Sequence, residues 1–323
     1  MARVKAIKRG KSPKADPSGG PQFAMDAFVG TSPASVESVT ANVTRLMQKK
    51  NFSSIAEANA FLKTIVESGD TPQAEPCSPL EEAQDIMYKA WDSPRKQAVN
   101  LAKKALELSK DCADAYVLLA QETACNVEGA RELYEKGVEA GERTLGGPVA
   151  FKEFAGHFWN ALETRPYMRA RFGLAKCLWE LGERQKAIEH YTDILRLNPD
   201  DNQGARYILI NCLLETGDTG AAEKLLKKYK WDCFASWAYS RALLSFQTGG
   251  DSMDARNHLR KALKQNRFVA PYLVGTKPLP ITLPPFMSPG CEDEAIHYVV
   301  ESWNAWERTD GAVDWLKANV NES

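Results

Sequence analysis

Three arginines recur at a constant interval in the middle of the chain. Arg171, Arg206 and Arg241 follow one another at steps of 35 residues. A guanidinium presents a planar fork of N–H donors that matches a carboxylate, so a row of arginines on one surface would bind an acidic or carboxylate-ended peptide. A second interpretation stays open, in which these arginines lie between helices and pair with acids of the chain such as Glu180 or Glu215.

Other polar residues close to these arginines would share their surface. If the arginines stand on the first helices of successive helical hairpins, they should stack in space as a ladder, and the polar side chains beside them could form a groove with them. The expected partner-binding residues are Arg169, Arg171, Lys176, Asn202, Gln203, Arg206 and Arg241. Such a groove would accept a peptide or protein partner, and the arginines favour an acidic one.

Patterns that carry catalysis or bind metals are missing from the sequence. The four histidines are His157, His190, His258 and His297. None is paired with a cysteine or an acid at a metal-ligand spacing, and no glycine-rich phosphate loop or nucleophile elbow is present. We therefore expect no metal, no cofactor and no enzymatic activity. The alternative is an active site around His157, which lies in the same segment as Glu163, Arg165 and Tyr167.

Helices must position the arginines, and the clearest helical pattern runs from Arg169 to Asn198. Apolar residues recur there at three- and four-residue steps on both sides of Leu181 and Gly182, which predicts two helices joined by a turn. Pro199 ends the second helix because proline lacks a backbone donor. A single helical hairpin cannot bury its own apolar face, so the pattern also predicts neighbouring hairpins.

This hairpin resembles the tetratricopeptide repeat. Gly182 at the turn, small Ala187 at the helix crossing, Tyr191 four residues later and Pro199 after the second helix match that motif. The small residue at the crossing recurs as Ala98, Ala130, Ala187, Ala222 and Ala255, at spacings of 32, 57, 35 and 33. The spacing predicts five hairpins with one insertion, at about residues 80–110, 111–142, 167–200, 201–233 and 234–268.

Over roughly residues 80–318 the chain is similar to a set of bacterial tetratricopeptide proteins and, more distantly, to the suppression-of-tumorigenicity family of eukaryotes. The segment from Arg165 to Tyr207, the proline-rich segment and the ending EDEAIHYVVESWNAWERTDGAVDWL carry this similarity. The resemblance implies an all-α, tetratricopeptide-like solenoid of helical hairpins, a right-handed superhelix with helical caps. It implies an interaction protein and supplies no catalytic motif.

Composition divides the chain into four parts. Residues 1–31 form a basic tail that we expect to be disordered, because it has too little apolar area to offset its ordering entropy. Residues 32–79 are expected to form a helical hairpin and a linker, 80–270 the repeat domain, and 271–323 a proline-rich strap with two capping helices. The first helix should bury an apolar stripe of Val36, Val39, Val43, Leu46 and Met47, and the apolar side chains of the strap should pack on the scaffold.

The bulk numbers limit the function further. A net charge of −1 argues against a general attraction to nucleic acid or membranes, and no apolar stretch is long enough to cross a bilayer. The seven cysteines form no C-x-x-C pair, which is typical of reduced thiols, and Cys177 and Cys212 should be buried. We expect a cytoplasmic protein–protein interaction scaffold. The alternative is a nucleic-acid-associated or regulatory protein that uses its basic N-terminal tail.

Overall fold

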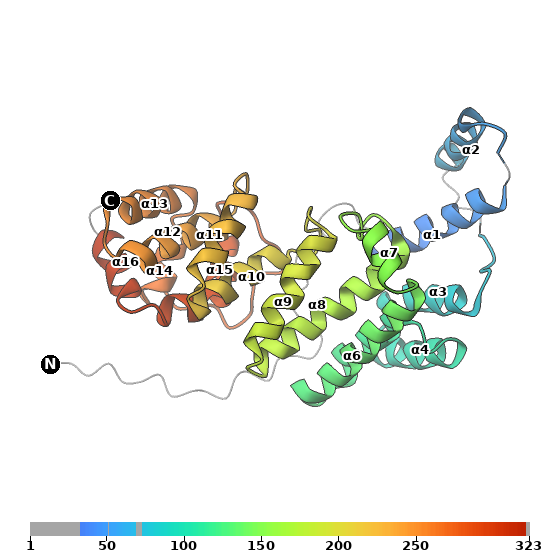
Figure 1. Ribbon diagram of the computed structural model, residues 1–323, viewed down its shortest axis with the longest axis horizontal. Coiled ribbons are helices and arrows are strands. Elements are labelled where there is room, and N and C mark those ends of the chain that lie inside the picture. The colour runs from blue at the N-terminus through green and yellow to red at the C-terminus, as the bar shows by residue number, and fades with distance from the viewer. Residues whose placement is uncertain (1–32, 51, 69–72, 321–323) are drawn as a thin grey trace. The chain divides into compact units, whose positions relative to one another are not determined.

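The computed structural model describes residues 33–50, 52–68 and 73–320, and all secondary structure in this part of the chain is helical (Figure 1). The expectations for the basic tail lie outside these residues. The contacts define two compact units. Unit 1 comprises the described residues up to His190 together with Arg196–Pro199, and unit 2 comprises Tyr191–Leu195 and the described residues from Asp200 onward.

Unit 1 holds the first two helices, two complete hairpins and the first helix of a third. Its helices are α1 (Pro33–Lys49), α2 (Ile55–Ser68), α3 (Pro79–Trp91), α4 (Arg95–Leu108), α5 (Ala113–Thr123), α6 (Val127–Thr144), α7 (Pro148–Glu153), the 3-10 helix η1 (Leu162–Thr164) and α8 (Arg165–Glu180). Helix α9 (Arg184–Leu197) is divided between the two units. The pairs α3–α4, α5–α6 and α8–α9 are the first three predicted hairpins.

Local sequence explains where these helices begin and turn. Helix α3 starts after Ser78, whose Oγ accepts a hydrogen bond from the N–H of Glu81, and Pro79 occupies the first helical position. Helices α8 and α9 meet at Gly182, which adopts a φ of 81°, a conformation that favours glycine. The all-α fold of helical hairpins that the sequence predicted is therefore confirmed.

Helix α8 is held against α6 by a close approach of the two backbones. A Cβ atom on Gly141 of α6 would lie 2.7 Å from the Cβ of Tyr167, and one on Gly173 of α8 would lie 2.1 Å from the ring of Tyr134. Only glycine fits at these two positions without a shift of the neighbouring residue. This contact fixes the face of α8 that bears the arginines described below.

The insertion predicted between the second and third hairpins contains α7 and η1. The rings of Phe151 and Phe158 pack on Tyr167, with centroids 4.9 and 6.2 Å from it, and Phe158 is completely buried. The N–H groups of Gly156 and Phe158 both donate to the carbonyl oxygen of Leu197. The insertion therefore covers the hairpin formed by α8 and α9 with a small aromatic core of its own.

Unit 2 continues with two more hairpins and the C-terminal helices. Its elements are α10 (Ala205–Thr216), α11 (Thr219–Lys228), α12 (Ala235–Gly249), α13 (Met253–Gln265), α14 (Val269–Leu273), α15 (Glu292–Glu307) and α16 (Ala312–Val320). The crossing residues Ala222 and Ala255 are fully buried, as predicted. Helix α15 packs on α10, α12 and α14 and buries Trp306. Both helices that the sequence predicted at the C-terminus are present.

The proline-rich strap between α14 and α15 corrects one expectation. Leu273 at the start of the predicted strap is completely buried in α14, but the later apolar side chains do not pack on the scaffold, because Ile281 is 99% exposed and Phe286 is 58% exposed. Polar contacts attach this part instead, among them the ion pair of Lys277 with Glu292. The carbonyl oxygen of Pro284 lies 2.9 Å from Nε2 of His297, and the N–H of Ser288 donates to Asp293. Prolines remove backbone donors from such a segment, so a few polar contacts hold it.

Candidate functional site

Helix α1 lies across the first helices of the hairpins in unit 1. It runs antiparallel to α3, since Ser35 near its start donates to Asp92 at the end of α3, while Arg45 near its end binds Asp85 (Figure 1). Glu81 and Asp85 on α3 and Arg165 and Arg169 on α8 bind charged side chains of α1, and Asp114 on α5 binds Arg169. We call these five residues the docking face.

The orientation of α1 differs from the one that the sequence predicted. Three polar side chains are buried, with exposed fractions of 6% for Glu37, 7% for Asn42 and 5% for Arg45. Val36 and Val39 of the predicted apolar stripe are 53% and 45% exposed, while the rest of the stripe is half-buried. The expectation that the stripe is buried is therefore wrong for its first two valines. The cause is the charge of the docking face, because buried charges need partners more strongly than two valines need burial.

One end of the docking face holds a carboxylate of α1 between two arginines. The carboxylate of Glu37 accepts hydrogen bonds from Nη1 of Arg165 at 3.0 Å and from Nη1 and Nη2 of Arg169 at 3.0 to 3.2 Å. Arg169 also donates to Asp114 on α5 through Nε at 2.8 Å and Nη2 at 2.6 Å. Asp114 in turn accepts a hydrogen bond from the side-chain amide of Gln84 on α3. Three helices of the scaffold thus position the groups that bind Glu37.

These charges are strongly coupled. Burial alone would lower the pKa of the Arg169 guanidinium, but the negative charges of Asp114 and Glu37 outweigh it and raise that pKa. Burial and the same two carboxylates raise the pKa of the Tyr88 hydroxyl on α3. Both groups therefore keep their usual protonation states, a guanidinium cation and a neutral phenol, across the physiological range.

The other end of the docking face has the opposite sign and binds a guanidinium of α1. Nη1 and Nη2 of Arg45 donate to the two carboxylate oxygens of Asp85, each at 2.7 Å, and Nε lies 3.0 Å from Glu81. The hydrogen bonds to Asp85 raise the pKa of Arg45, against the lowering effect of burial. This parallel two-bond geometry fixes the orientation of the guanidinium as well as its charge. The docking face therefore distinguishes the two ends of α1.

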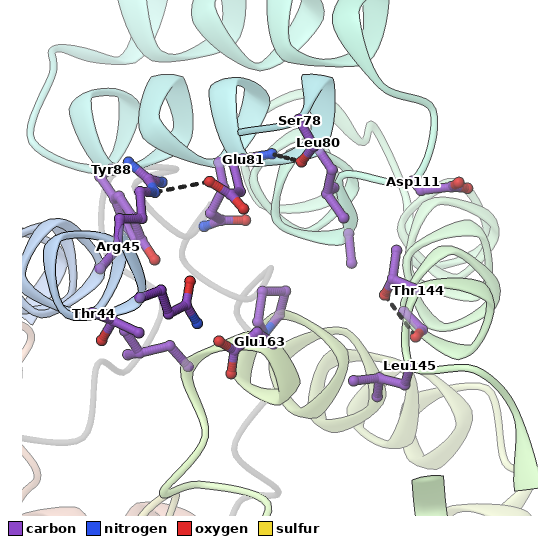
Figure 2. Close-up of a pocket in the computed structure, with 17 residues that line it drawn as sticks. Thr44, Arg45, Ser78, Leu80, Glu81, Tyr88, Asp111, Thr144, Leu145 and Glu163 are labelled. Carbon is purple, nitrogen blue, oxygen red and sulfur yellow. Dashed lines mark hydrogen bonds and ion pairs between the residues drawn. The ribbon is translucent and has the colours of Figure 1, made fainter. Parts of the chain in front are cut away.

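A cavity of about 260 Å³ lies between α1 and the scaffold. Figure 2 shows Thr44 and Arg45 of α1 on one side of it and, on another, Thr144 at the end of α6 with Leu145 just after it. Ala41 also lines it, midway between the two charged residues of α1. The short side chains of Ala41 and Thr44 leave this space unfilled.

The seven residues predicted to bind a partner do not all have the same surroundings. On α8, Arg169 belongs to the docking face, and Lys176 is exposed. Arg171 donates from Nε to Nδ1 of His190 at 3.1 Å and from Nη1 to the hydroxyl of Tyr167 at 2.6 Å. Arg171 is thus engaged by side chains of its own unit.

Arg206 takes the structural alternative that the sequence left open. Its side chain is 10% exposed, and it donates to Asp201 at 3.0 Å, to Asp232 at 2.8 Å and to the hydroxyl of Tyr207 at 2.6 Å. Each nitrogen of its guanidinium makes one of these bonds, so Arg206 is engaged within its own unit, and its place in a partner-binding groove stays a prediction. Asn202 and Gln203 are half-buried in the turn before α10, and Arg241 is 28% exposed near Glu223.

The alternative active site around His157 is not assembled in the structure. His157 is exposed, whereas Tyr167 is 1% exposed and Arg165 is bound by Glu37. Within the described residues, the side chains of histidine, cysteine, aspartate and glutamate form no group of three or more that could hold a metal ion. Cys177 and Cys212 are buried, as predicted.

Sequence reasoning singled out Arg169 but missed its connection with α1 and the acids of α3 that bind Arg45. Glu37 and Arg45 stand beside a conspicuous run of valines, which predicted burial of the opposite side of the helix. One signal was present. Glu37, Ala41 and Arg45 follow at four-residue steps and so share one helix face, as do Arg165 and Arg169 on α8. Opposite charges at matching spacing on two helices indicate a contact between them.

A family model described as "ST7 protein" matches residues 75–323, which is more than half of the chain. The chain belongs to the ST7 family. The predicted similarity to the suppression-of-tumorigenicity family is thereby confirmed. In this ST7-family chain the matched residues include α3, α5 and α8, which carry the docking face, while α1 precedes them.

Several relatives extend the comparison. "Suppressor of tumorigenicity 7 protein-like" of Rattus norvegicus is 28% identical over 268 residues, which covers 74% of this chain and 46% of the rat protein. The protein of that description from Homo sapiens is 27% identical over 266 residues, covering 74% and 45%. "Protein ST7 homolog" of Caenorhabditis elegans is 26% identical over 275 residues, covering 72% and 49%. The ST7-family chain thus spans about half the length of the curated relatives it matches.

A solved structure adds a likeness of fold. The crystal structure of YrrB, described as a TPR protein with an unusual peptide-binding site, has a TM-score of 0.42 and 20% identity over 64% of this ST7-family chain and 91% of YrrB. Among the described residues, no helix combines the length and the apolar character needed to cross a bilayer.

Proposed function

We propose that this ST7-family chain is a non-catalytic interaction scaffold, and that the docking face of unit 1 binds a helical segment of a protein partner through a carboxylate. The single observation that carries the proposal is the carboxylate of Glu37 between Arg165 and Arg169. A helix already occupies this face, and charge-assisted hydrogen bonds to Glu37 and Arg45 hold it there.

The arginines are preorganised for this role. Nε of Arg165 donates to the carbonyl oxygen of Trp159 at 2.8 Å, and two nitrogens of Arg169 are fixed by Asp114. Side chains held in this way lose little conformational entropy when a carboxylate binds. Binding therefore needs no rearrangement of α8, and the arginines favour the acidic partner that the sequence analysis expected.

The test converts α1 into a separate chain. A protease site is placed between Ser68 and Gln73 in the full-length protein, and the purified protein is cleaved without denaturation. We expect the N-terminal fragment to remain bound through the docking face and to leave as the salt concentration rises, because ion pairs at a partly exposed face are screened. Equilibrium binding of the labelled fragment gives its affinity.

Matched variants make the measurement specific. Glu37→Gln should weaken the binding of the fragment by roughly 30- to 160-fold, the effect of losing charge-assisted hydrogen bonds worth about 2 to 3 kcal/mol. Glu67→Gln on α2 makes the same chemical change at a side chain that is 64% exposed, and it should leave the affinity unaltered. If the fragment dissociates and does not rebind, or if neither substitution changes its affinity, the docking face is not a binding site.

A further inference from the structure

Removal of α1 would leave complementary charges without partners at two places. Arg169 would keep Asp114, whereas Arg165 would lose the carboxylate that it binds among these contacts. Glu81 and Asp85 would lose the guanidinium that they share. The docking face therefore accepts a negative group at one end and a positive group at the other. A helix inserted in the reverse direction would place like charges together at both ends.

The spacing of the α1 side chains defines what a helix must present. Glu37, Ala41 and Arg45 lie at successive four-residue steps, so each stands about 6 Å along the helix from the previous one. The middle position faces the cavity of about 260 Å³, which a methyl group does not fill. A larger apolar side chain there would bury more area and add contacts that α1 lacks.

Helix α1 has the properties of a replaceable occupant. Its buried side is polar, and the desolvation of buried ion pairs offsets much of their attraction. Two of its valines, which would supply apolar burial, are instead exposed, Val36 by 53% and Val39 by 45%. A helix that combined the same charges with apolar contact would therefore bind the docking face more tightly than α1 does.

We propose that the partner of the docking face is an amphipathic helix with a carboxylate, a large apolar side chain and a guanidinium at successive four-residue steps, and that α1 occupies the site until such a helix displaces it. This inference rests on the proposed function. It identifies the chemistry of the partner and makes binding a competition with a segment of the same chain.

The experiment uses synthetic peptides of residues 33–49 to displace the labelled fragment from the cleaved full-length protein. The peptides are the native sequence, Ala41→Leu, and an order-reversed control with Glu37→Arg and Arg45→Glu, which keeps the composition of the native peptide. Leucine and alanine have similar helix propensities, so the first substitution changes chiefly the side chain at the cavity. We expect Ala41→Leu to displace the fragment at roughly tenfold lower concentration, and the reversed peptide to be at least tenfold weaker than the native one.

The uncleaved protein tests the competition. A tethered α1 acts at an effective concentration in the millimolar range, so every peptide should bind it far more weakly than it binds the cleaved protein. Equal binding to both forms would overturn the role of α1 as the occupant. An Ala41→Leu peptide no better than the native one, or a reversed peptide of equal strength, would overturn the partner chemistry. Either result leaves the proposed function intact if the fragment still binds and responds to Glu37→Gln, so the two failures are distinguishable.

Discussion

Replacing Glu37 by glutamine in the intact chain should release α1 without unfolding the scaffold. The substitution keeps the shape of the side chain and removes the charge that Arg165 and Arg169 bind. Loss of one partner from a buried ion pair costs about 3 to 5 kcal/mol. The two arginine side chains are 21% and 22% exposed, and Arg169 retains Asp114, so we expect the lower value of about 2 to 3 kcal/mol. The docking equilibrium of α1 would shift by roughly 30- to 160-fold.

The variant Asp114→Asn is the control for this prediction. Asp114 is completely buried on α5, where it binds Arg169 and Gln84. Because α5 belongs to the scaffold, the site around Asp114 cannot become hydrated through the release of α1. The substitution should lower the free energy of unfolding of unit 1 by about 3 to 5 kcal/mol. In Glu37→Gln the cost is limited to the docking free energy of α1, because the freed arginines become hydrated once the helix has left.

Amide hydrogen exchange read residue by residue separates these outcomes. In Glu37→Gln, protection should fall in α1 and stay at its native level in α5 and α8, with the thermal midpoint of the scaffold nearly constant. In Asp114→Asn, protection should fall throughout the hairpins. The reasoning is refuted if Glu37→Gln leaves the exchange of α1 unaltered, or if it destabilises α5 as strongly as Asp114→Asn does.

Three further predictions concern the scaffold. Gly141→Ala should cost roughly 1 to 3 kcal/mol in denaturant unfolding, because the new Cβ would lie 2.7 Å from the Cβ of Tyr167, and native stability would disprove the close approach of α6 and α8. Arg206→Ala should cost about 3 to 5 kcal/mol, since it leaves the buried carboxylate of Asp232 without its cation, yet the folded fraction should bind the α1 peptide as the native chain does. Burial, with the positive charges nearby, lowers the pKa of His258, so the unfolded state takes up more protons. The stability of unit 2 should therefore be full above about pH 6.5 and decrease as the pH falls through the lowered pKa, a dependence that calorimetry should find missing in His258→Gln.

The repeat architecture could be predicted from sequence because it rests on local periodicity. The turn at Gly182, the crossing residue Ala187 and the spacing of the other alanines specified the hairpins and the place of the insertion. Each of these signals reflects contacts between residues close in the chain, which periodicity reports well. The strap was predicted less well, since its apolar composition indicated packing and Ile281 is exposed.

The site was harder to predict because it joins residues far apart in the sequence. Glu37 lies more than a hundred positions from Arg169, and no pattern within α1 states which side meets a neighbour. The regular spacing of Arg171, Arg206 and Arg241 followed the repeat, but a repeated position can serve the packing of each hairpin as well as a ligand. Arg206 shows this, because its neighbours Asp201 and Asp232 complete a buried ion-pair network.

The polar side that α1 turns toward the scaffold has a calorimetric consequence. Heat-capacity changes arise from hydration, and burial of apolar surface lowers the heat capacity whereas burial of polar surface raises it. The contact of α1 buries Glu37 and Arg45 and half-buries Val43 and Leu46, so the two contributions oppose each other. Docking should therefore have a heat-capacity change near zero. Its enthalpy would then be almost constant with temperature, in contrast to the hairpins, whose stability follows a curved dependence. Cooling would therefore destabilise the apolar core of the scaffold before it weakened the docking of α1.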